Sequence, residues 1–346
     1  MNRKDEHVSL AKAFHKTQRN DFDDVTIIHQ SFPNCRVSDV SIATDLFEQP
    51  LTSPFFINAM TGGSEKTLEY NRQLAILARE TDLMMATGSV SAALKDPSVA
   101  ASYTVVRQEF PEGCLLANVG AGTTLANAQR AVELFEANAL QIHLNAPQEL
   151  VMPEGDRDFT SWLPQLEEIV THLDVPVIVK EVGFGMTRET IQQLLSIGVT
   201  IIDVAGSGGT SFTQIENARR KKREFAYLDH FGQSTVASLL EAKEVPVPFE
   251  LVASGGIRDA YDIFKALCLG AKTVGVSGTL LNHLLTNGLD ATIELVRQWQ
   301  YELTVLYAMT GTLQTSKLKK IPLLLSGNPK NWCDARNIDS KKYSLR

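Results

Sequence analysis

Long apolar runs are missing from this 346-residue sequence. No stretch approaches the roughly 20 apolar residues that a membrane-spanning helix needs, so we expect no membrane partner. The first ten residues, MNRKDEHVSL, are charged, and no apolar segment follows them, so we expect no secretory signal. The four cysteines, at positions 35, 114, 268 and 333, form neither a CxxC motif nor a zinc-binding pattern. Their spacing favours a reducing, cytoplasmic setting.

An excess of positive charge is also missing. The formal net charge is −7, which argues against general nucleic-acid binding. It leaves open a local basic pocket for phosphate. Low-complexity segments and short solenoid repeats are absent as well. The sequence is 44% hydrophobic, which is enough to bury a substantial core.

What is present is a coarser repetition. Short apolar segments recur eight times, and each is followed by Gly, Ser or Asn and then by a helical pattern. The segments occupy residues 54–60, 83–90, 115–121, 140–145, 176–183, 201–209, 251–256 and 273–278. Apolar strands that alternate with helices indicate a parallel sheet covered by helices, and eight units favour an α/β fold of the (β/α)8 TIM-barrel type. An open doubly wound sheet is the alternative.

The barrel is expected to span residues 51–326. Residues 1–50 precede the first strand and should form an N-terminal extension that caps or flanks it. Residues 327–346 are polar, and we expect them to form a peripheral C-terminal tail.

Polar residues gather where the predicted strands end. In TIM barrels the active site lies at the C-terminal ends of the strands. Seven or eight polar strand ends together predict a lined pocket. The last two strands are followed by the glycine-bearing turns ASGGIRDA (253–260) and GVSGT (275–279). One such turn alone reads as a tight connection, but two in succession, beside a helix N-terminus, favour a phosphate site.

Lys180 lies inside the apolar segment VIVKEVG. A buried ammonium is costly unless it meets an anion or a polar acceptor. It either pairs with a nearby carboxylate such as Glu181 or faces an electron-rich cofactor. Composition does not identify that cofactor.

Two further groups of polar residues have both a plain and a functional interpretation. Arg3, Lys4 and His7 lie within about one helical turn and form either a solvated charged end or a cationic clamp for a diphosphate. Gln148 and Glu149 form either a solvated loop pair or a site where Glu149 binds Mg²⁺ and Gln148 orients a substrate or relays a proton. Strand alternation sends His143 and Asn145 to the same side, toward this loop.

Taken together, these motifs resemble those of the type 2, flavin-dependent isopentenyl-diphosphate isomerase family. They follow the family's order along nearly the whole sequence, and NAMTGG, NxxQE and KEVGFG are the most specific of them. The matching segments are RKDEH (3–7), INAMTGGS (57–64), TGSVSAAL (87–94), HLNAPQELVMPEGDRDF (143–159), VKEVGFGM (179–186), GSGGTSF (206–212) and SGGIRDAYDIFKALCLGA (254–271).

The resemblance implies a barrel that binds FMN and interconverts isopentenyl and dimethylallyl diphosphate with reduced FMN and Mg²⁺, with NADPH as the reductant. It also implies a homo-oligomer, a tetramer or an octamer, in which the N-terminal extension contributes to the substrate site. The family's flavin contacts fall on Ala59, Met60, Thr61, Ser89, Asn118, Lys180, Thr210, Gly255, Gly256, Ser277 and Gly278. Its substrate contacts fall on Arg3, Lys4, His7, Ser89, Val90, Ser91, His143, Asn145 and Gln148. Glu149 falls on its metal ligand, and we expect catalytic roles for Gln148, Lys180 and His143.

Two positions depart from the family pattern. Many members have a serine where this sequence has Ala205, so we assign no flavin hydrogen bond there. Many relatives have tryptophan where this sequence has Phe231, so an apolar wall is kept and an indole N–H is lost.

The expected mechanism follows from the weak basicity of an alkene. Its protonation generates cationic character at C3, and apart from Glu149 no strongly acidic side chain stands in these motifs. We therefore expect reduced FMN to act as the acid/base. One alternative is an FMN-dependent 2-hydroxy-acid oxidase, but the turn after strand seven lacks the histidine base of such enzymes. A second alternative is a non-enzymatic flavin or phosphate sensor, although the sequence has no segment that resembles an effector or DNA-binding element.

Overall fold

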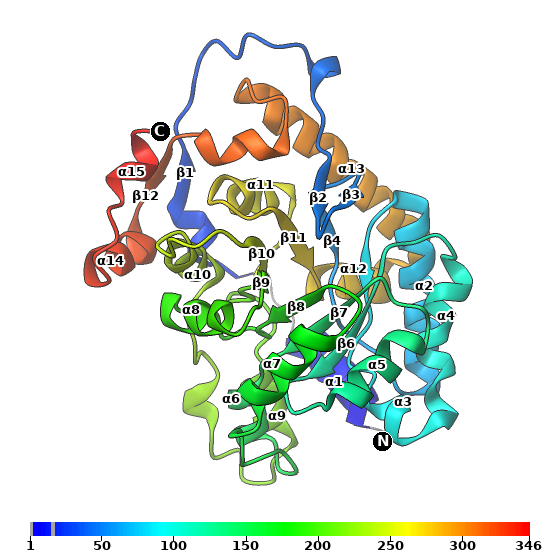
Figure 1. Cartoon of the computed structure of the whole chain (residues 1–346). Helices are drawn as coiled ribbons and strands as arrows, with labels where there is room; N and C mark the ends of the chain where they lie inside the picture. The colour runs from blue at the N-terminus through cyan, green and yellow to red at the C-terminus, as the bar shows by residue number, and fades with distance from the viewer. Residues whose placement is uncertain (1–2, 15–17) are drawn as a thin grey trace.

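The computed structural model describes residues 3–14 and 18–346, and its centre is a closed barrel of eight parallel strands (Figure 1). β11 pairs in parallel with β4, so that Val274 stands opposite Phe55 and the ring is closed. The TIM-barrel prediction is confirmed, and the open doubly wound sheet is excluded. The barrel strands are β4 (Phe55–Ile57), β5 (Met85–Ala86), β6 (Leu115–Gly120), β7 (Ala139–His143), β8 (Val177–Lys180), β9 (Ile201–Asp203), β10 (Glu250–Ser254) and β11 (Thr273–Val276).

Helices follow the strands and cover the barrel. Many of them begin at a Ser, Thr or Asp whose side chain accepts the backbone N–H three residues later, as Ser64 does from Thr67 and Asp259 does from Asp262. Helices outside the barrel include α2 (Glu65–Thr81), α4 (Ala101–Glu109), α5 (Leu125–Glu133), α7 (Trp162–His172), α8 (Arg188–Ser196), α10 (Thr235–Ala242), α11 (Ala260–Cys268) and α13 (Leu289–Met309). The others near the strand ends are α3 (Ser91–Lys95), α6 (Ala146–Val151), α9 (Phe212–Arg219) and α12 (Gly278–Asn287), with the short 3₁₀ segments η3 (Pro97–Val99) and η4 (Ala226–Leu228).

A hairpin closes one end of the barrel. It consists of β2 (Thr44–Leu46) and β3 (Gln49–Leu51), which pair antiparallel. Leu46 is fully buried and packs, with Leu51, in an apolar cluster that includes Phe56, Leu116 and Ile178. These side chains fill the barrel interior near the hairpin, which leaves the opposite end, where the strands finish, open for a ligand. Figure 1 shows α1, α3, α6 and α9 gathered at that opposite end.

The two ends of the chain pack against the barrel. Helix α1 (Arg3–Phe14) contacts α2 and α9, and η1 (Asp21–Asp24) leads into β1 (Val25–Ile27). β1 pairs antiparallel with β12 (Leu323–Leu325), which joins the N-terminal extension to the C-terminal segment. The elements between β1 and β2, and between α13 and β12, are the 3₁₀ segments η2 (Val37–Asp39) and η5 (Thr315–Lys320).

The polar residues 327–346 form two helices, α14 (Gly327–Ala335) and α15 (Lys341–Ser344). Tyr343 is fully buried, and Arg336 lies 2.7 Å from the buried Glu241 on α10. The segment therefore lies outside the barrel but is anchored to it. Across the described residues, no helix is both long and apolar enough to cross a membrane.

Candidate active site

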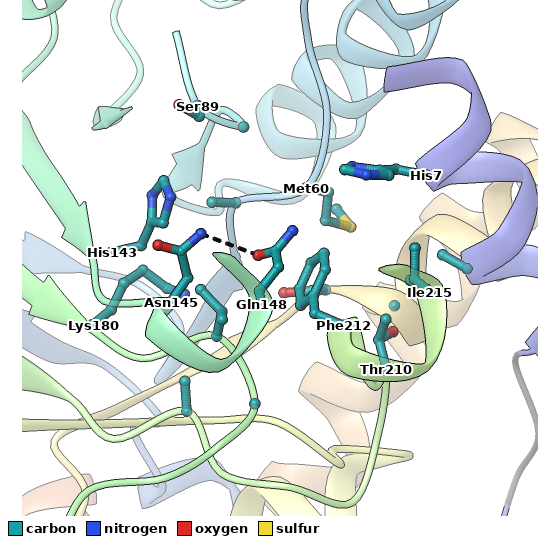
Figure 2. A pocket seen from close by; sticks show the side chains of 18 of the residues that line it. His7, Met60, Ser89, His143, Asn145, Gln148, Lys180, Thr210, Phe212 and Ile215 are labelled. Carbon is teal, nitrogen blue, oxygen red and sulfur yellow. Dashed lines mark hydrogen bonds between the residues drawn. The ribbon is translucent and has the colours of Figure 1, made fainter. Parts of the chain in front are cut away.

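A cavity of about 710 Å³ opens at the C-terminal ends of the strands (Figure 2). All eight strand ends contribute to its lining, and helices α1, α6 and α9 complete it. Figure 2 shows His143 and His7 on opposite sides of the pocket, with Gln148 between them. Residues separated by more than 100 positions in the sequence are thus brought to one place by closure of the barrel.

Almost every residue predicted to bind flavin, substrate or metal lines this cavity. One exception is Val90, whose side chain is fully buried in the core, while its backbone N–H donates to the Asn118 carbonyl at 2.8 Å. The other is Arg3, the first residue of α1, whose side chain lies outside the described part of the chain.

One side of the cavity is made of backbone. Gly255 and Gly256 have φ of 91° and 75°, a region that favours glycine. A Cβ on Gly255 would lie 2.1 Å from the Gly206 carbonyl oxygen, so no side chain fits there. Beside these turns α12 begins after Ser277, which supplies no side-chain cap. The first N–H groups of that helix are therefore available to a ligand, as a phosphate requires.

Lys180 enters the cavity from the end of β8 and is only 6% exposed. Its Nζ donates to the backbone carbonyl of Glu181 at 2.5 Å, and in register it stands opposite the fully buried Asp203. Burial lowers the pKa of Lys180 and raises that of Asp203, while each charge opposes the shift of the other. Burial also raises the pKa of Glu181 to about 8. Lys180 thus faces the cavity, and the charge of Asp203 on the neighbouring strand β9 partly offsets the cost of burying it.

The residues around Lys180 suit a flavin. Thr61 is buried and lines the cavity, and within the described residues its hydroxyl has no hydrogen-bond partner. Because a buried polar atom without a partner is costly, such a hydroxyl is explained by a polar ligand atom beside it. An orphaned hydroxyl, a buried cation and a backbone phosphate cradle in one cavity fit the isoalloxazine ring and phosphate of FMN.

Gln148 and Glu149 do not lie in a loop, as the sequence had led us to expect. They belong to helix α6, because Asn145 precedes the helix and Pro147 stands in its first turn, where its missing N–H costs nothing. The Asn145 amide donates to Gln148 Oε1 at 3.2 Å and to Glu149 Oε1 at 3.0 Å. The short helix therefore holds both side chains toward the cavity.

Glu216 is the main residue that the sequence reasoning missed. It lies on α9 and is fully buried, with Oε1 2.9 Å from Gln148 Nε2 and 3.0 Å from His7 Nε2. Its Oε2 accepts from Arg219 at 2.5 Å. Burial alone would raise the pKa of Glu216, but His7, Gln148 and Arg219 outweigh it and hold the pKa below its ordinary value. The sequence does contain the oppositely charged pair Glu216 and Arg219 at i,i+3, but this spacing is typical of an ion pair on the surface of a helix, so it did not indicate a buried site.

The metal prediction rests on one carboxylate. In the described part of the chain, no three His, Cys, Asp or Glu side chains converge as a preformed metal site. Glu149 accepts from Asn145 through Oε1 and from the Asp156 N–H through Oε2, which leaves further lone pairs on both oxygens. This arrangement suits Mg²⁺, which takes one or two protein carboxylates and draws its other ligands from phosphate and water.

The two departures from the family pattern have different surroundings. Ala205 is buried, lines the cavity and has φ of 25°, which is unusual for alanine. Phe231 is 52% exposed and pairs with Phe184 at 6.3 Å between ring centroids. Phe231 is not among the described residues that line the cavity, so the prediction that it forms an apolar wall of the site was wrong. Met60, Phe212 and Ile215 supply apolar lining instead.

Comparisons with known proteins agree with this geometry. A family model described as FMN-dependent dehydrogenase matches residues 117–323. The chain is similar to the isopentenyl-diphosphate delta-isomerase of Latilactobacillus sakei subsp. sakei (strain 23K), with 50% identity over 337 residues, covering 97% of this chain and 96% of that one. It is 47% identical over 346 residues to the isopentenyl-diphosphate delta-isomerase of Streptomyces sp. (strain CL190), covering 99% of this chain and 95% of the other.

Solved structures support the fold alone, because their sequences are distant. A mandelate oxidase with a monooxide FMN adduct superposes with a TM-score of 0.62 at 17% identity, covering 93% of this chain and 92% of the other. A flavocytochrome b2 with sulfite bound gives a TM-score of 0.63 at 16% identity, covering 90% of this chain and 81% of the other.

Proposed function

The chain belongs to the FMN-dependent dehydrogenase family and to the isopentenyl-diphosphate delta-isomerases, and from this premise we propose that it interconverts isopentenyl and dimethylallyl diphosphate in isoprenoid biosynthesis, using reduced FMN and Mg²⁺. The observation that carries the proposal is a single cavity that joins the buried cation Lys180 to Gln148 and Glu149. A ring cofactor, an apolar substrate tail and a metal-bound diphosphate can all contact one another there.

In this proposal FMN lies between Lys180 and the glycine-rich turns. Thr61, Ser89, Asn118 and the backbone at Ala59 and Met60 would hold its ring. The phosphate would be held by Thr210 and by the turns at 255–256 and 277–278. When bound, reduced FMN supplies a protonatable N5 and an electron-rich face for a cationic transition state.

Lys180 has an electrostatic task in this arrangement. Its ammonium is buried, and within the described residues it donates one hydrogen bond, to the Glu181 carbonyl, so it can stabilise negative charge on the ring. Burial lowers the pKa of Lys180, and the nearby carboxylates of Asp203 and Glu181 oppose that shift and so favour the charged form.

Gln148 would orient the substrate or relay its proton. Both ends of its amide are engaged, the oxygen by Asn145 and the nitrogen by Glu216, so its position does not depend on the ligand. Such preorganisation costs no reorganisation when the proton moves. The apolar side chains of Met60, Phe212 and Ile215 would face the five-carbon tail and exclude water from it.

The diphosphate would lie at the mouth of the cavity. Lys4 and His7 reach the cavity from α1, and Ser89 and Ser91 line it from the β5–α3 turn. Glu149 would hold Mg²⁺ against the diphosphate, while Arg3 is proposed from the resemblance alone. NADPH as the reductant, a cytoplasmic setting and a homo-oligomer also belong to this proposal. The four unpaired cysteines support a reducing compartment.

An FMN-dependent 2-hydroxy-acid oxidase is the rival on the same fold. Such an enzyme needs a histidine base after strand seven, whereas the two cavity-lining histidines among the described residues, His7 and His143, come from α1 and β7. The comparisons with isomerases over nearly the full length also disfavour it.

The test is to purify the protein, record its absorbance spectrum and assay isopentenyl diphosphate with FMN either oxidised or reduced by NADPH or dithionite. We expect a yellow protein that forms dimethylallyl diphosphate only when FMN is reduced and Mg²⁺ is present. Full turnover with FMN kept oxidised would defeat the acid/base proposal. Anaerobic bleaching of oxidised flavin by a 2-hydroxy acid would instead favour the oxidase.

A further inference from the structure

A line of buried amides crosses the inside of the barrel toward the cavity. Asn58 follows β4, Gln141 lies on β7 and Asn118 lies on β6, and all three are almost fully buried. Gln141 Nε2 donates to Asn58 Oδ1 at 2.9 Å, and Asn118 Nδ2 donates to Gln141 Oε1 at 3.2 Å. At the end of the line, Asn118 Oδ1 lies 2.9 Å from His143 Nδ1.

The orientation of the amide groups in this line is fixed at the Asn58 end, which is the end away from His143. Asn58 Nδ2 donates to Asp203 Oδ2 at 2.9 Å, and Asn58 Oδ1 accepts the backbone N–H of Ala59 at 2.8 Å. A backbone N–H can only donate, so the Asn58 oxygen must face Ala59 and the Asn58 NH₂ group must face Asp203. Reversing the Asn58 amide would therefore break both bonds in a buried place, where an unpaired polar group is costly.

The fixed orientation passes from one amide to the next. Because the Asn58 oxygen accepts, Gln141 must present its NH₂ group to Asn58 and its oxygen to Asn118. Asn118 must then present its NH₂ group to Gln141 and its oxygen to His143. The ring nitrogen that faces this oxygen has to be a donor, so the proton of a neutral His143 lies on Nδ1.

We propose that Gln141 is a positioning residue that transmits this orientation from Asn58 to Asn118 and so holds His143 with its proton on Nδ1 and an acceptor lone pair on Nε2. Gln141 does not line the cavity, and its effect on the ligand passes through Asn118 and His143. The proposal rests on the proposed function only in naming the ligand that His143 meets.

The consequence concerns what His143 can bind. Burial, together with the nearby Lys180 and Lys4, lowers the pKa of His143 to about 3, so the ring is neutral near neutral pH. A neutral ring with its proton on Nδ1 cannot donate through Nε2 to a phosphate oxygen. It accepts instead, and the group that suits it is an O–H of the hydrated head group, since Mg²⁺ keeps several waters when it binds a diphosphate. Gly120 supports this by leaving the Nε2 edge uncovered, because a Cβ there would lie 3.4 Å from Nε2.

A backbone hydrogen bond with Val119 also acts on His143, and it opposes the lowering of the ring's pKa. The hydrogen bond that sets the tautomer joins Nδ1 to Asn118. A proton placed on Nε2 instead would leave two acceptors, Nδ1 and Asn118 Oδ1, facing each other at 2.9 Å.

The experiment measures the tautomer directly. Protein containing ¹⁵N-labelled histidine is studied by magic-angle-spinning NMR with and without FMN, and a His143→Gln variant identifies the His143 signals among the seven histidines. The unprotonated nitrogen of a neutral imidazole resonates far downfield of the protonated one. We expect the downfield signal to come from Nε2, and a downfield Nδ1 in the wild-type protein would overturn the proposal.

Two substitutions of matched size test the relay itself. Gln141→Met removes both polar atoms, frees the Asn118 amide to rotate and should produce a second population with the proton on Nε2. In Gln141→Glu the buried carboxyl is expected to stay protonated, so that its O–H donates to Asn58 and its C=O accepts from Asn118, and the wild-type tautomer should return. The relay is wrong if Gln141→Met keeps the wild-type tautomer, or if Gln141→Glu behaves like Gln141→Met.

A kinetic measurement separates positioning from general damage. Because one ligand hydrogen bond is misdirected, Gln141→Met should raise KM for isopentenyl diphosphate about fivefold with kcat changed less, and Gln141→Glu should restore KM. Equal losses of kcat in both variants, with KM unchanged, would refute the positioning role. Since the NMR signature requires no turnover, it can succeed or fail independently of the proposed isomerase activity.

Discussion

The amide of Gln148 donates to the carboxylate of Glu216 at 2.9 Å, although the two residues are 68 positions apart and lie on different helices, α6 and α9. The same carboxylate is 3.0 Å from His7 Nε2 on α1. One buried acid thus connects Gln148, which we propose lies at the substrate tail, with His7, which we propose lies at its head group. The orientation of Gln148 is therefore set by the protein before any ligand arrives.

Shortening Gln148 tests its role in proton transfer. In Gln148→Asn the amide no longer reaches Glu216, so we expect kcat to fall about 100-fold while KM for isopentenyl diphosphate changes less than about threefold. Steady-state kinetics and the rate of solvent deuterium incorporation measure these effects. An unchanged kcat would remove Gln148 from the chemical step, and a large rise in KM alone would make it a binding residue.

Removing Glu149 tests the metal site. Because Glu149 is the one protein carboxylate assigned to Mg²⁺, Glu149→Ala should shift the midpoint of the Mg²⁺ titration about tenfold higher. Glu154→Ala is the matched control, because Glu154 also lines the cavity mouth but pairs with Arg219 at 2.6 Å. An identical Mg²⁺ titration in wild type and Glu149→Ala would exclude Glu149 as the ligand.

Replacing Lys180 by a neutral residue tests two of its effects, the effect of its charge on the flavin and its contribution to the stability of the protein. Lys180→Met should lower the flavin reduction potential, because a cation beside the ring favours the anionic reduced form. It should also destabilise the protein by about 3 kcal/mol, because Asp203 is left buried without its partner. Potentiometry and urea unfolding measure the two effects. The double variant Lys180→Met with Asp203→Asn should regain stability but not the potential. If the potential is unchanged in both variants, Lys180 does not act on the ring.

Lowering the pH should weaken the contacts between the C-terminal segment and the barrel, because these contacts depend on the ionised carboxylate of Glu241. Burial alone would raise its pKa, but hydrogen bonds from Arg336, Arg188 and Trp332 outweigh it and lower the pKa from 4.5 to about 2. A depressed carboxylate pKa adds stability that is fully present above 4.5 and is lost as the pH falls from 4.5 toward 2.

The matching experiment compares Glu241→Gln with the wild type by urea unfolding across this range. We expect Glu241→Gln to cost about 2 kcal/mol at pH 7 and the difference to shrink as the pH falls. Glu244→Gln is the control, because the Glu244–Lys342 pair is more exposed and should contribute less than about 1 kcal/mol. A difference that stays constant down to the lowest pH would contradict this assignment.

Much of the fold was predictable because the sequence pattern that indicates each barrel strand lies within that strand and the turn after it. The eight apolar segments and the Gly, Ser or Asn that follows them reflect local burial and local turns, which depend on residues close in sequence. Helix starts such as Ser64 and Asp259 are likewise local. The secondary structure around Gln148 was not predicted, because a six-residue helix that contains a proline has almost no periodicity to detect.

The sequence by itself determined the eight barrel strands, the polar residues at their ends and the buried position of Lys180, but not the strands β1, β2, β3 and β12 outside the barrel. Only the tertiary structure decided which polar side chains meet. Glu216, Asn58 and Gln141 lie in segments whose sequences are typical of ordinary surface or core. The residues near them in the sequence do not predict which side chains they contact. Their partners come from other strands and helices. The folded barrel and the helices at its strand ends bring each pair to 2.9 Å, Gln141 to Asn58 and Gln148 to Glu216, in buried places where an unpaired polar group is costly.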